Sequence, residues 1–373
     1  MDALSDIAED VEFYAINERC DVVPRELCFS EWMSLPGGDL GKFNAMEQLE
    51  GERRKTYGDI RRVLVPEGLA EEAASRTGAF VGMTRPEYIK LVRRMLNIGM
   101  SRLRRKVKSV NGIFGVWKER PGGGKKVPSR KPGKGRRADA PCGPEGPATS
   151  PPAPDCHGFD SPGKIRLIID MRRGNCFFMS PDKVELVTPS GLAQIHLDPE
   201  EIMVMSKADL DNYFYRCRVP EAYWEYFGLP AVTAEELGAT EEEMRRWTGE
   251  MGDFGGDFHP VMCVLPMGWS HAPLVAQEAH ENLLGKTSEL VEDHRLRESQ
   301  AWRGRKWCHF CYIDDTVVFV IGPRKEIEKL KAECNRLMAG ALGAYADAGI
   351  PVKPEKVEEA ATVMVILGLT VDG

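Results

Sequence analysis

The chain has 373 residues, of which 42% are hydrophobic and 29% charged, and its formal net charge is −7. That apolar fraction excludes wholesale disorder, and the length fits two or three domains or one domain with insertions. We find no apolar run of the roughly 20 residues that a membrane helix needs and no signal peptide, so no membrane is expected as a partner. The ten cysteines lack framework spacing, which favours an intracellular setting.

One basic stretch departs from the acidic average. Residues 102–137 hold 14 Lys or Arg against a single acid, so this stretch carries +13 and the rest of the chain −20. Contact with the phosphates of a nucleic acid and a solvated basic run both explain such a block, and composition alone leaves the two equal.

The predicted elements of the first half are few. Residues 1–84 show no clear period, and their role stays open. Apolar residues three and four apart predict a helix over 85–108, and a strand is predicted over 113–117. Residues 120–163 are so rich in Pro and Gly that we expect an exposed, disordered loop or linker of basic character. A second strand is predicted over 165–170.

Strands and helices alternate in the second half. Strands are predicted over 202–208, 261–265, 307–313, 316–321 and 363–371, and helices over 209–223, 240–246, 273–284 and 326–346. The strands pair mainly with their neighbours in sequence, so the predicted class is α+β with a largely antiparallel sheet.

Paired carboxylates are the sharpest chemical feature. Asp314 and Asp315 lie between two apolar strands, at the expected tip of a hairpin, and Asp209 ends an earlier strand. Adjacent carboxylates repel each other until a divalent cation neutralises them. Three of them on adjacent strand ends can hold the two Mg²⁺ ions of phosphoryl transfer. The Asp314–Asp315 pair taken alone favours a solvated acidic turn over a metal site.

Seven segments, in order, resemble the reverse transcriptase family of retroviruses and retrotransposons. They are IFGVWK at 113–118, IRLIIDMR at 165–172, DLDNYFY at 209–215, VLPMGWSHAP at 264–273, YIDD at 312–315, GIPVKPEK at 349–356 and ILGLTV at 366–371. The resemblance implies a right-hand polymerase palm, an antiparallel sheet packed on helices, with a fingers subdomain. The implied divisions are 1–84 of unknown role, 85–119 as the start of the fingers, 120–163 as an insertion and 164–373 as the rest of the fingers and the palm.

The resemblance also implies roles for the acidic residues. Asp209 and Asp314 would bind both metal ions, Asp315 would be a further catalytic carboxylate, and the Leu210 carbonyl would complete one metal shell. Lys356 matches the residue that protonates the leaving pyrophosphate. A solvated surface lysine is the alternative for Lys356.

Four further residues match nucleotide-binding positions of the family. Lys118 and Arg166 would hold the triphosphate from two facing strands. The ring of Phe214 would exclude a 2′-hydroxyl, and a core aromatic is the alternative reading. Gly268 would let the backbone approach the nucleotide closely.

The implied function is RNA-directed DNA synthesis in a retroelement. The partners would be an RNA or DNA template with its primer and deoxynucleoside triphosphates, and the cofactors two Mg²⁺ ions, with Mn²⁺ as a substitute. Met267 and Ala272 stand where the family usually has Gln and Ser, and the expected thumb has no counterpart before Gly373. An inactive retroelement relic, an RNA-templated RNA polymerase and a nucleic-acid-binding fragment therefore stay open, although Phe214 opposes the second.

Overall fold

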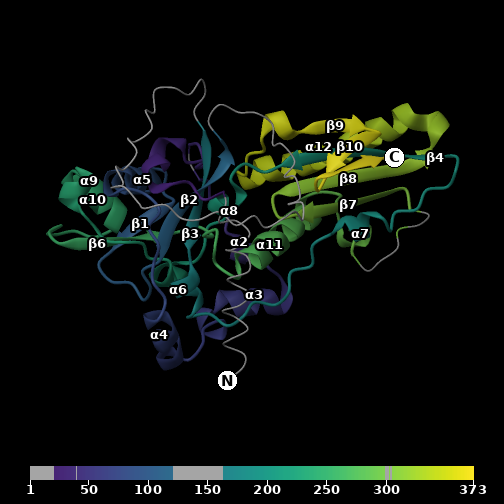
Figure 1. Ribbon diagram of the computed structural model, residues 1–373. Coiled ribbons are helices and arrows are strands. Elements are labelled where there is room, and N and C mark those ends of the chain that lie inside the picture. The colour runs from purple at the N-terminus through teal and green to yellow at the C-terminus, as the bar shows by residue number, and fades with distance from the viewer. Residues whose placement is uncertain (1–20, 39, 121–162, 299–301, 303–304) are drawn as a thin grey trace, which may run out of the picture.

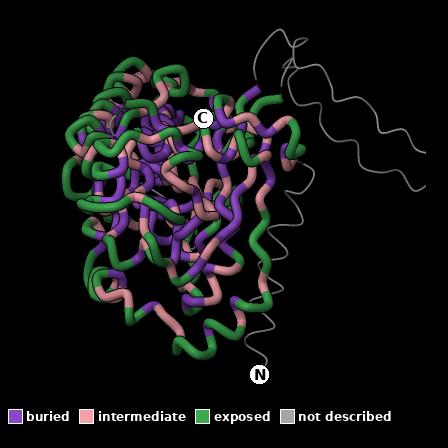
Figure 2. The backbone as a smooth tube through the Cα atoms, turned by 90° about the vertical axis from the view of Figure 1, so that its left-hand side faces the viewer, coloured by how far each residue is buried: buried purple, intermediate pink, exposed green. Residues whose placement is uncertain are grey.

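The computed structural model describes residues 21–38, 40–120, 163–298, 302 and 305–373. These residues form two regions, which lie side by side in Figure 1. A four-stranded sheet with its helices lies on the right, and short sheets with α5, α9 and α10 lie on the left. Figure 2 shows buried residues gathered in the interior, with exposed residues mostly along the outside. The architecture confirms the predicted α+β class with antiparallel pairing.

The amino-terminal region folds onto the predicted fingers hairpin. Its helices are α2 (Ala45–Gln48), α3 (Gly51–Gly58) and α4 (Glu67–Ser75). The hairpin consists of β2 (Gly112–Glu119) and β3 (Lys164–Asp170), as predicted. Val22 bridges to Val116, and Met33 bridges to Ile165, so the described residues before 85 add backbone contacts to both strands of the hairpin.

The helix predicted over 85–108 is shorter than expected. Helix α5 (Arg85–Asn97) ends before Gly99, whose φ of 75° lies in the left-handed region. The chain then forms β1 (Ser101–Arg104), which pairs with β6 (Asp257–Met262). Leu103 continues the three-and-four apolar spacing, but it is buried as a strand residue.

Small elements complete the left-hand region. β6 also pairs with β5 (Val232–Thr233). The strand predicted over 261–265 corresponds to β6, which begins and ends earlier than expected. The helices here are α6 (Arg172–Asn175), α9 (Ala234–Leu237) and α10 (Glu241–Thr248). The last of these begins with a capping box between Thr240 and Glu243.

The prediction of a helix over 209–223 is also wrong. Only one turn forms, α8 (Tyr213–Arg216), because the next residues extend between two neighbours. Arg218 donates its backbone N–H to the carbonyl of Phe43, and Val219 donates to Cys263. A short 3-10 helix then starts after Pro220.

The four-stranded sheet has the order β7-β8-β4-β9 and is antiparallel throughout. Its strands are β4 (Glu201–Asp209), β7 (Trp307–Tyr312), β8 (Asp315–Pro323) and β9 (Glu358–Ala361). Helices α11 (Ala272–Thr287) and α12 (Ile327–Ala348) contact the sheet and each other. Along β4, Val204 joins the core on the helix side, whereas Met203 and Met205 join a second core on the opposite face.

A hairpin covers that opposite face. The single strand predicted over 363–371 is two strands, β10 (Val363–Ile366) and β11 (Leu369–Asp372). Leu367 and Gly368 both have positive φ, which is the geometry of a tight two-residue hairpin turn. Met364 and Ile366 pack on Met203 and Met205 in the second core.

The remaining short elements are α7 (Pro189–Leu192) and 3-10 turns at Arg25–Leu27, Ser30–Trp32, Ile60–Arg62, Glu221–Tyr226, Glu292–His294, Arg324–Glu326 and Pro354–Lys356. Among the helices formed by described residues, none combines the length and apolar character needed to cross a bilayer.

Candidate active site

The three predicted carboxylates lie at one end of the four-stranded sheet. Asp209 and Asp315 are directly opposite each other in the β4–β8 register. The Leu210 N–H donates to the Asp314 carbonyl at 2.8 Å, which ties the end of β4 to the β7–β8 turn. The turn itself contains Ile313 and Asp314, and Asp315 is already in β8, so the predicted two-aspartate turn is shifted by one residue.

This concentration of negative charge changes the acidity of the site. Burial and the neighbouring charge of Asp209 raise the pKa of Asp314 above its ordinary value. Burial, together with the charges of Asp314 and Asp209, raises the pKa of Asp315 to about 6. Both groups therefore carry negative charge that the surrounding protein compensates poorly.

Two lysines, one of them not predicted, compensate Asp209. Lys353 donates to one carboxylate oxygen of Asp209 and to the Leu210 carbonyl, the latter at 3.1 Å, and Lys356 donates to the other carboxylate oxygen. Burial by itself raises the pKa of Asp209, but these two hydrogen bonds bring it below its ordinary value. Burial lowers the pKa of Lys356, but the bond to Asp209 and the charges of Asp209, Asp315 and Asp314 together bring it above its ordinary value.

Backbone pairing explains why Lys353 reaches the site. Val352 bridges to Leu210, and the Lys353 N–H donates to the Asp209 carbonyl at 2.9 Å. The side chain of Lys353 is only 12% exposed. The signal available in the sequence was that Lys353 lies in the same segment as Lys356, at 349–356.

The donor set fits a divalent cation. Carboxylate and carbonyl oxygens are the ligands that Mg²⁺ prefers. The ammonium of Lys353 contacts an oxygen of Asp209 and the carbonyl of Leu210 together, so these two oxygens already converge on one cationic group. Among the described residues, no three His, Cys, Asp or Glu side chains are grouped closely enough to hold an ion. Binding of a cation would therefore require Asp209 to release Lys353 and Lys356 and to contact the ion instead.

The fingers hairpin brings two more cations towards the carboxylates. Lys118 lies near the end of β2, and Arg166 faces Val116 across the hairpin. Burial lowers the pKa of Lys118, and repulsion from Lys353, Lys356 and Arg166 lowers it further. The structure therefore brings together both predicted triphosphate-binding residues and the acidic end of the sheet.

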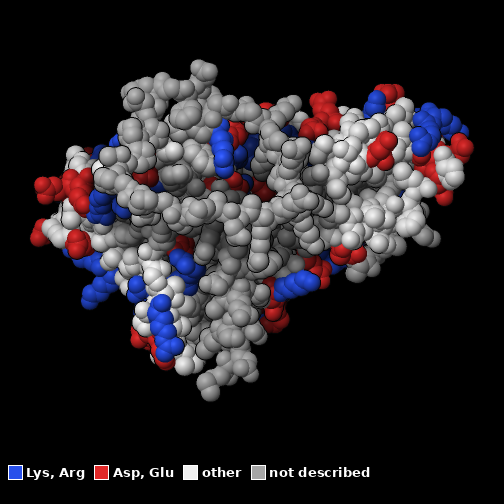
Figure 3. Space-filling model, in the orientation of Figure 1, with Lys and Arg blue, Asp and Glu red and all other residues white. Residues whose placement is uncertain are grey.

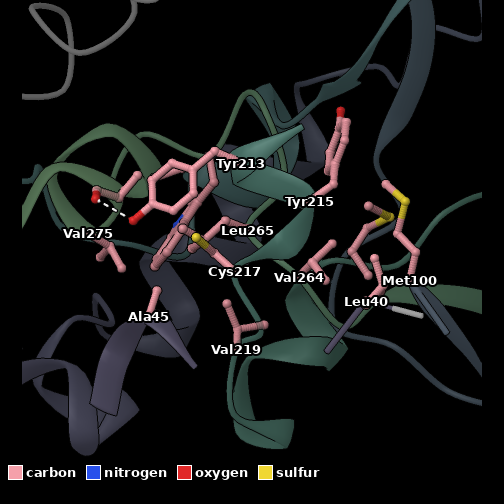
Figure 4. Packing of buried hydrophobic residues seen from close by; sticks show 14 of the residues in the cluster. Leu40, Ala45, Met100, Tyr213, Tyr215, Cys217, Val219, Val264, Leu265 and Val275 are labelled. Atoms are coloured by element: carbon pink, nitrogen blue, oxygen red, sulfur yellow. Dashed lines mark hydrogen bonds between the residues drawn. The ribbon is translucent and has the colours of Figure 1, made fainter. Parts of the chain in front are cut away.

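Helix α8 determines where Phe214 points. The residues on either side of Phe214 in the sequence are buried and bonded to different elements. The Tyr213 hydroxyl donates to the Ala276 carbonyl at 3.0 Å, and the Tyr215 hydroxyl donates to the Leu167 carbonyl at 2.7 Å. Figure 4 shows these two tyrosines pointing in different directions from the helix. Phe214 lies between them and is half-buried, with part of its ring packed on the core.

Gly268 has a structural requirement of its own. Its φ is 123°, and a Cβ at this position would lie 2.1 Å from the Ile169 carbonyl oxygen. The Ile169 N–H donates to the Met267 carbonyl at 2.9 Å, so the two backbones are in close contact. Glycine is needed here to join β3 to the segment before α11, whereas the approach to a nucleotide stays a prediction.

Helix α11 holds the carboxylate turn from beneath, which the sequence did not predict. The Gln277 amide accepts from the Ile313 N–H at 2.7 Å and donates to the Cys311 carbonyl at 2.8 Å. Gln277 is 2% exposed and forms both contacts with the backbone of the hairpin. A glutamine four residues after Pro273 was the only signal in the sequence.

The described part of the basic stretch is largely bonded within the protein. Arg102 donates to the Arg246 carbonyl, and Arg105 donates to the carbonyls of Gly255 and Asp253. On the face shown in Figure 3, the described basic and acidic side chains are interspersed. Residues 121–137, which complete the predicted stretch, lie outside the described residues.

Comparison with known proteins identifies the family. The family model described as reverse transcriptase (RNA-dependent DNA polymerase) matches residues 156–371, which is more than half of the chain. The chain belongs to the reverse transcriptase family. Members of this family are RNA-directed DNA polymerases and generally use divalent metal ions. No curated protein matches the chain.

Solved structures of foamy virus enzymes are similar to the chain. One is the foamy viral protease-reverse transcriptase in complex with double-stranded DNA, at 14% identity and a TM-score of 0.42, covering 78% of this chain and 34% of that one. Another is the native prototype foamy virus protease-reverse transcriptase, at 13% identity and a TM-score of 0.42, covering 76% of this chain and 25% of that one. The chain therefore spans about a third or less of the length of either protein.

Proposed function

We propose that the chain catalyses RNA-directed DNA synthesis and derives from a retroelement. Its substrates would be a primed RNA or DNA template and deoxynucleoside triphosphates. The observation that supports this best is the placement of Asp209, Asp314 and Asp315 at one end of a sheet. Lys118 of the fingers hairpin lies close enough for the charge of Asp209 to raise the pKa of Lys118, against the larger lowering by burial.

Each residue of the site would have a distinct task. Asp209, Asp314 and the Leu210 carbonyl would hold two Mg²⁺ ions, with Asp315 beside them. The ions would supply activation of the primer 3′-hydroxyl and neutralise charge on the phosphates. Lys353 and Lys356 would release Asp209 when the cations bind, because one carboxylate cannot fully satisfy both kinds of partner.

The basic and aromatic residues would handle the nucleotide. Lys118 and Arg166 would bind its triphosphate through charge-assisted hydrogen bonds. Phe214 would exclude a ribose 2′-hydroxyl by its bulk. Lys356, whose pKa is raised, keeps its proton near neutral pH and would donate it to the departing pyrophosphate.

A second candidate is a nucleic-acid-binding relic without catalysis. Met267 and Ala272, which replace the usual Gln and Ser, favour it. The carboxylates oppose it, because Asp314 and Asp315 are retained at a cost: their raised pKa values show that the folded protein disfavours their charged forms.

Primer extension separates the candidates. The purified chain is incubated with a labelled primer on RNA and on DNA templates, with Mg²⁺ or Mn²⁺, and with deoxynucleotides or ribonucleotides. The proposal predicts extension with deoxynucleotides on the RNA template. Binding of the primed template without extension under either metal would support the relic instead.

A further inference from the structure

A strained turn precedes the catalytic carboxylates. Ile313 has a φ of 55°, which a β-branched residue adopts only when its surroundings force it. The peptide group that follows Ile313 joins it directly to Asp314. Whatever fixes the Ile313 backbone therefore fixes where the Asp314 carboxylate points.

His280 of α11 holds the carbonyl side of that turn. Its Nδ1 lies 2.8 Å from the Ile313 carbonyl oxygen. A carbonyl oxygen can only accept, so Nδ1 must carry the proton. The ring is 0% exposed, and burial lowers the pKa of His280 to about 4, so the imidazole is neutral and its Nε2 is an acceptor.

Two hydroxyl groups meet that acceptor. The Tyr345 hydroxyl of α12 lies 2.6 Å from Nε2, and the Thr316 hydroxyl of β8 lies 3.1 Å from it. The two hydroxyls also bond each other. All three side chains are at most 1% exposed. A donor at Nε2 fixes the tautomer that donates from Nδ1, so the chain of bonds runs in one direction from α12 to the turn.

The geometry points to His280 as a positioning residue for the proposed polymerase reaction. It acts through the Ile313 carbonyl and, with Tyr345 and Thr316, holds Asp314 in the orientation that binds metal. The inference rests on the proposed function, but it concerns a residue outside the segments that resemble the family's motifs.

Two conservative variants separate this role from simple packing. In His280→Asn the amide nitrogen takes the place of Nδ1 and keeps the bond to Ile313, whereas Tyr345 loses its acceptor. In His280→Gln the amide reaches the place of Nε2, and the Ile313 carbonyl loses its donor. Each variant breaks one side of the same network. Packing alone predicts the larger loss for His280→Asn, because the smaller asparagine leaves the larger void at this buried position.

A buried histidine elsewhere in the sheet supplies the control. His309 of β7 is 2% exposed, and its Nε2 lies 3.0 Å from the Val291 carbonyl, away from the turn. His309→Gln tests whether any buried histidine substitution lowers activity. The melting temperature of each variant is measured first, and rates are compared at a temperature where all are folded.

The readouts are kcat and KM in primer extension and Mn²⁺ affinity by electron paramagnetic resonance. We expect His280→Gln to lower kcat and Mn²⁺ affinity about 10- to 100-fold, which is the usual effect of losing a residue that orients a metal ligand. The KM for the primed template should stay unchanged. His280→Asn and His309→Gln should stay within a few-fold of the wild type.

Equal losses in the two His280 variants, no loss in either, or the reverse order would overturn the inference while leaving the proposed function intact. An equal loss in His309→Gln would overturn it as well. If the wild-type chain extends no primer, the proposed function fails, and the Mn²⁺ titration alone then decides whether His280 positions Asp314.

Discussion

Replacing Gly268 by alanine should be far more harmful than an ordinary glycine substitution. The new Cβ would lie 2.1 Å from the Ile169 carbonyl oxygen, where ordinary contacts begin at 3.4 Å, so one of the two backbones must move by more than an ångström. The φ of 123° adds roughly 1–3 kcal/mol of conformational strain for a residue with a Cβ. The steric overlap adds roughly 1–3 kcal/mol more.

The sum is a loss of roughly 2–6 kcal/mol in the free energy of unfolding, which is a large part of the stability of most proteins. Urea denaturation followed by circular dichroism measures it. Because β3 carries Arg166 and bonds the Met267 carbonyl through Ile169, any protein that still folds should also have a higher KM for deoxynucleotides.

Gly285 of α11 is the matched control. It is exposed in a helix, and a Cβ there would meet no atom within 4 Å. Gly285→Ala should raise the free energy of unfolding by about 0.5–1 kcal/mol, because alanine loses less backbone entropy on folding. If Gly268→Ala unfolds within about 0.5 kcal/mol of the wild type, the close contact with Ile169 does not explain the glycine.

Three further predictions concern single side chains. Phe214→Val should raise ribonucleotide incorporation about 10- to 100-fold, because a steric clash of about 1–3 kcal/mol is relieved; unchanged discrimination in primer extension would make Phe214 a core residue only. Lys118→Ala should raise the deoxynucleotide KM about 10-fold or more through loss of a charge-assisted hydrogen bond, and an unchanged KM would remove Lys118 from the triphosphate site. Burial lowers the pKa of His309 to about 4, below the 6.5 of an unfolded chain, so its contribution to stability is complete above pH 6.5 and falls towards pH 4. His309→Gln should therefore reduce the acid-induced loss of unfolding free energy between pH 7.5 and 5 by about 2 kcal/mol, and identical pH profiles would contradict this.

The sequence was most informative where local pattern and tertiary structure agree. The apolar runs that became β4, β7 and β8 are buried on both faces, and the aspartates at their ends stand out against them. The β1 strand was missed because Leu103 continues the spacing of α5 across Gly99, and only pairing with β6 distinguishes a strand from a longer helix there.

Long-range contacts explain what the sequence could not predict in the site. Lys353 is a surface lysine by pattern, and it reaches Asp209 because Val352 bridges to Leu210. His280 fits the buried stripe of α11, and its polar role depends on Tyr345, 65 residues later. Such contacts arise from the packing of α11 and α12 under the carboxylate turn.

Asp314 gives the most direct test of the central claim that the carboxylate cluster synthesises DNA. Burial and the charge of Asp209 raise the pKa of Asp314, so Asp314→Asn removes a charge that the folded protein disfavours and should not lower stability. The measurement is primer extension on an RNA template with Mg²⁺, by wild type and Asp314→Asn side by side, together with their urea midpoints. We predict extension by the wild type, none by the variant, and a variant midpoint at or above that of the wild type. Equal extension by both proteins would contradict the assignment of Asp314 and the two-metal account built on it.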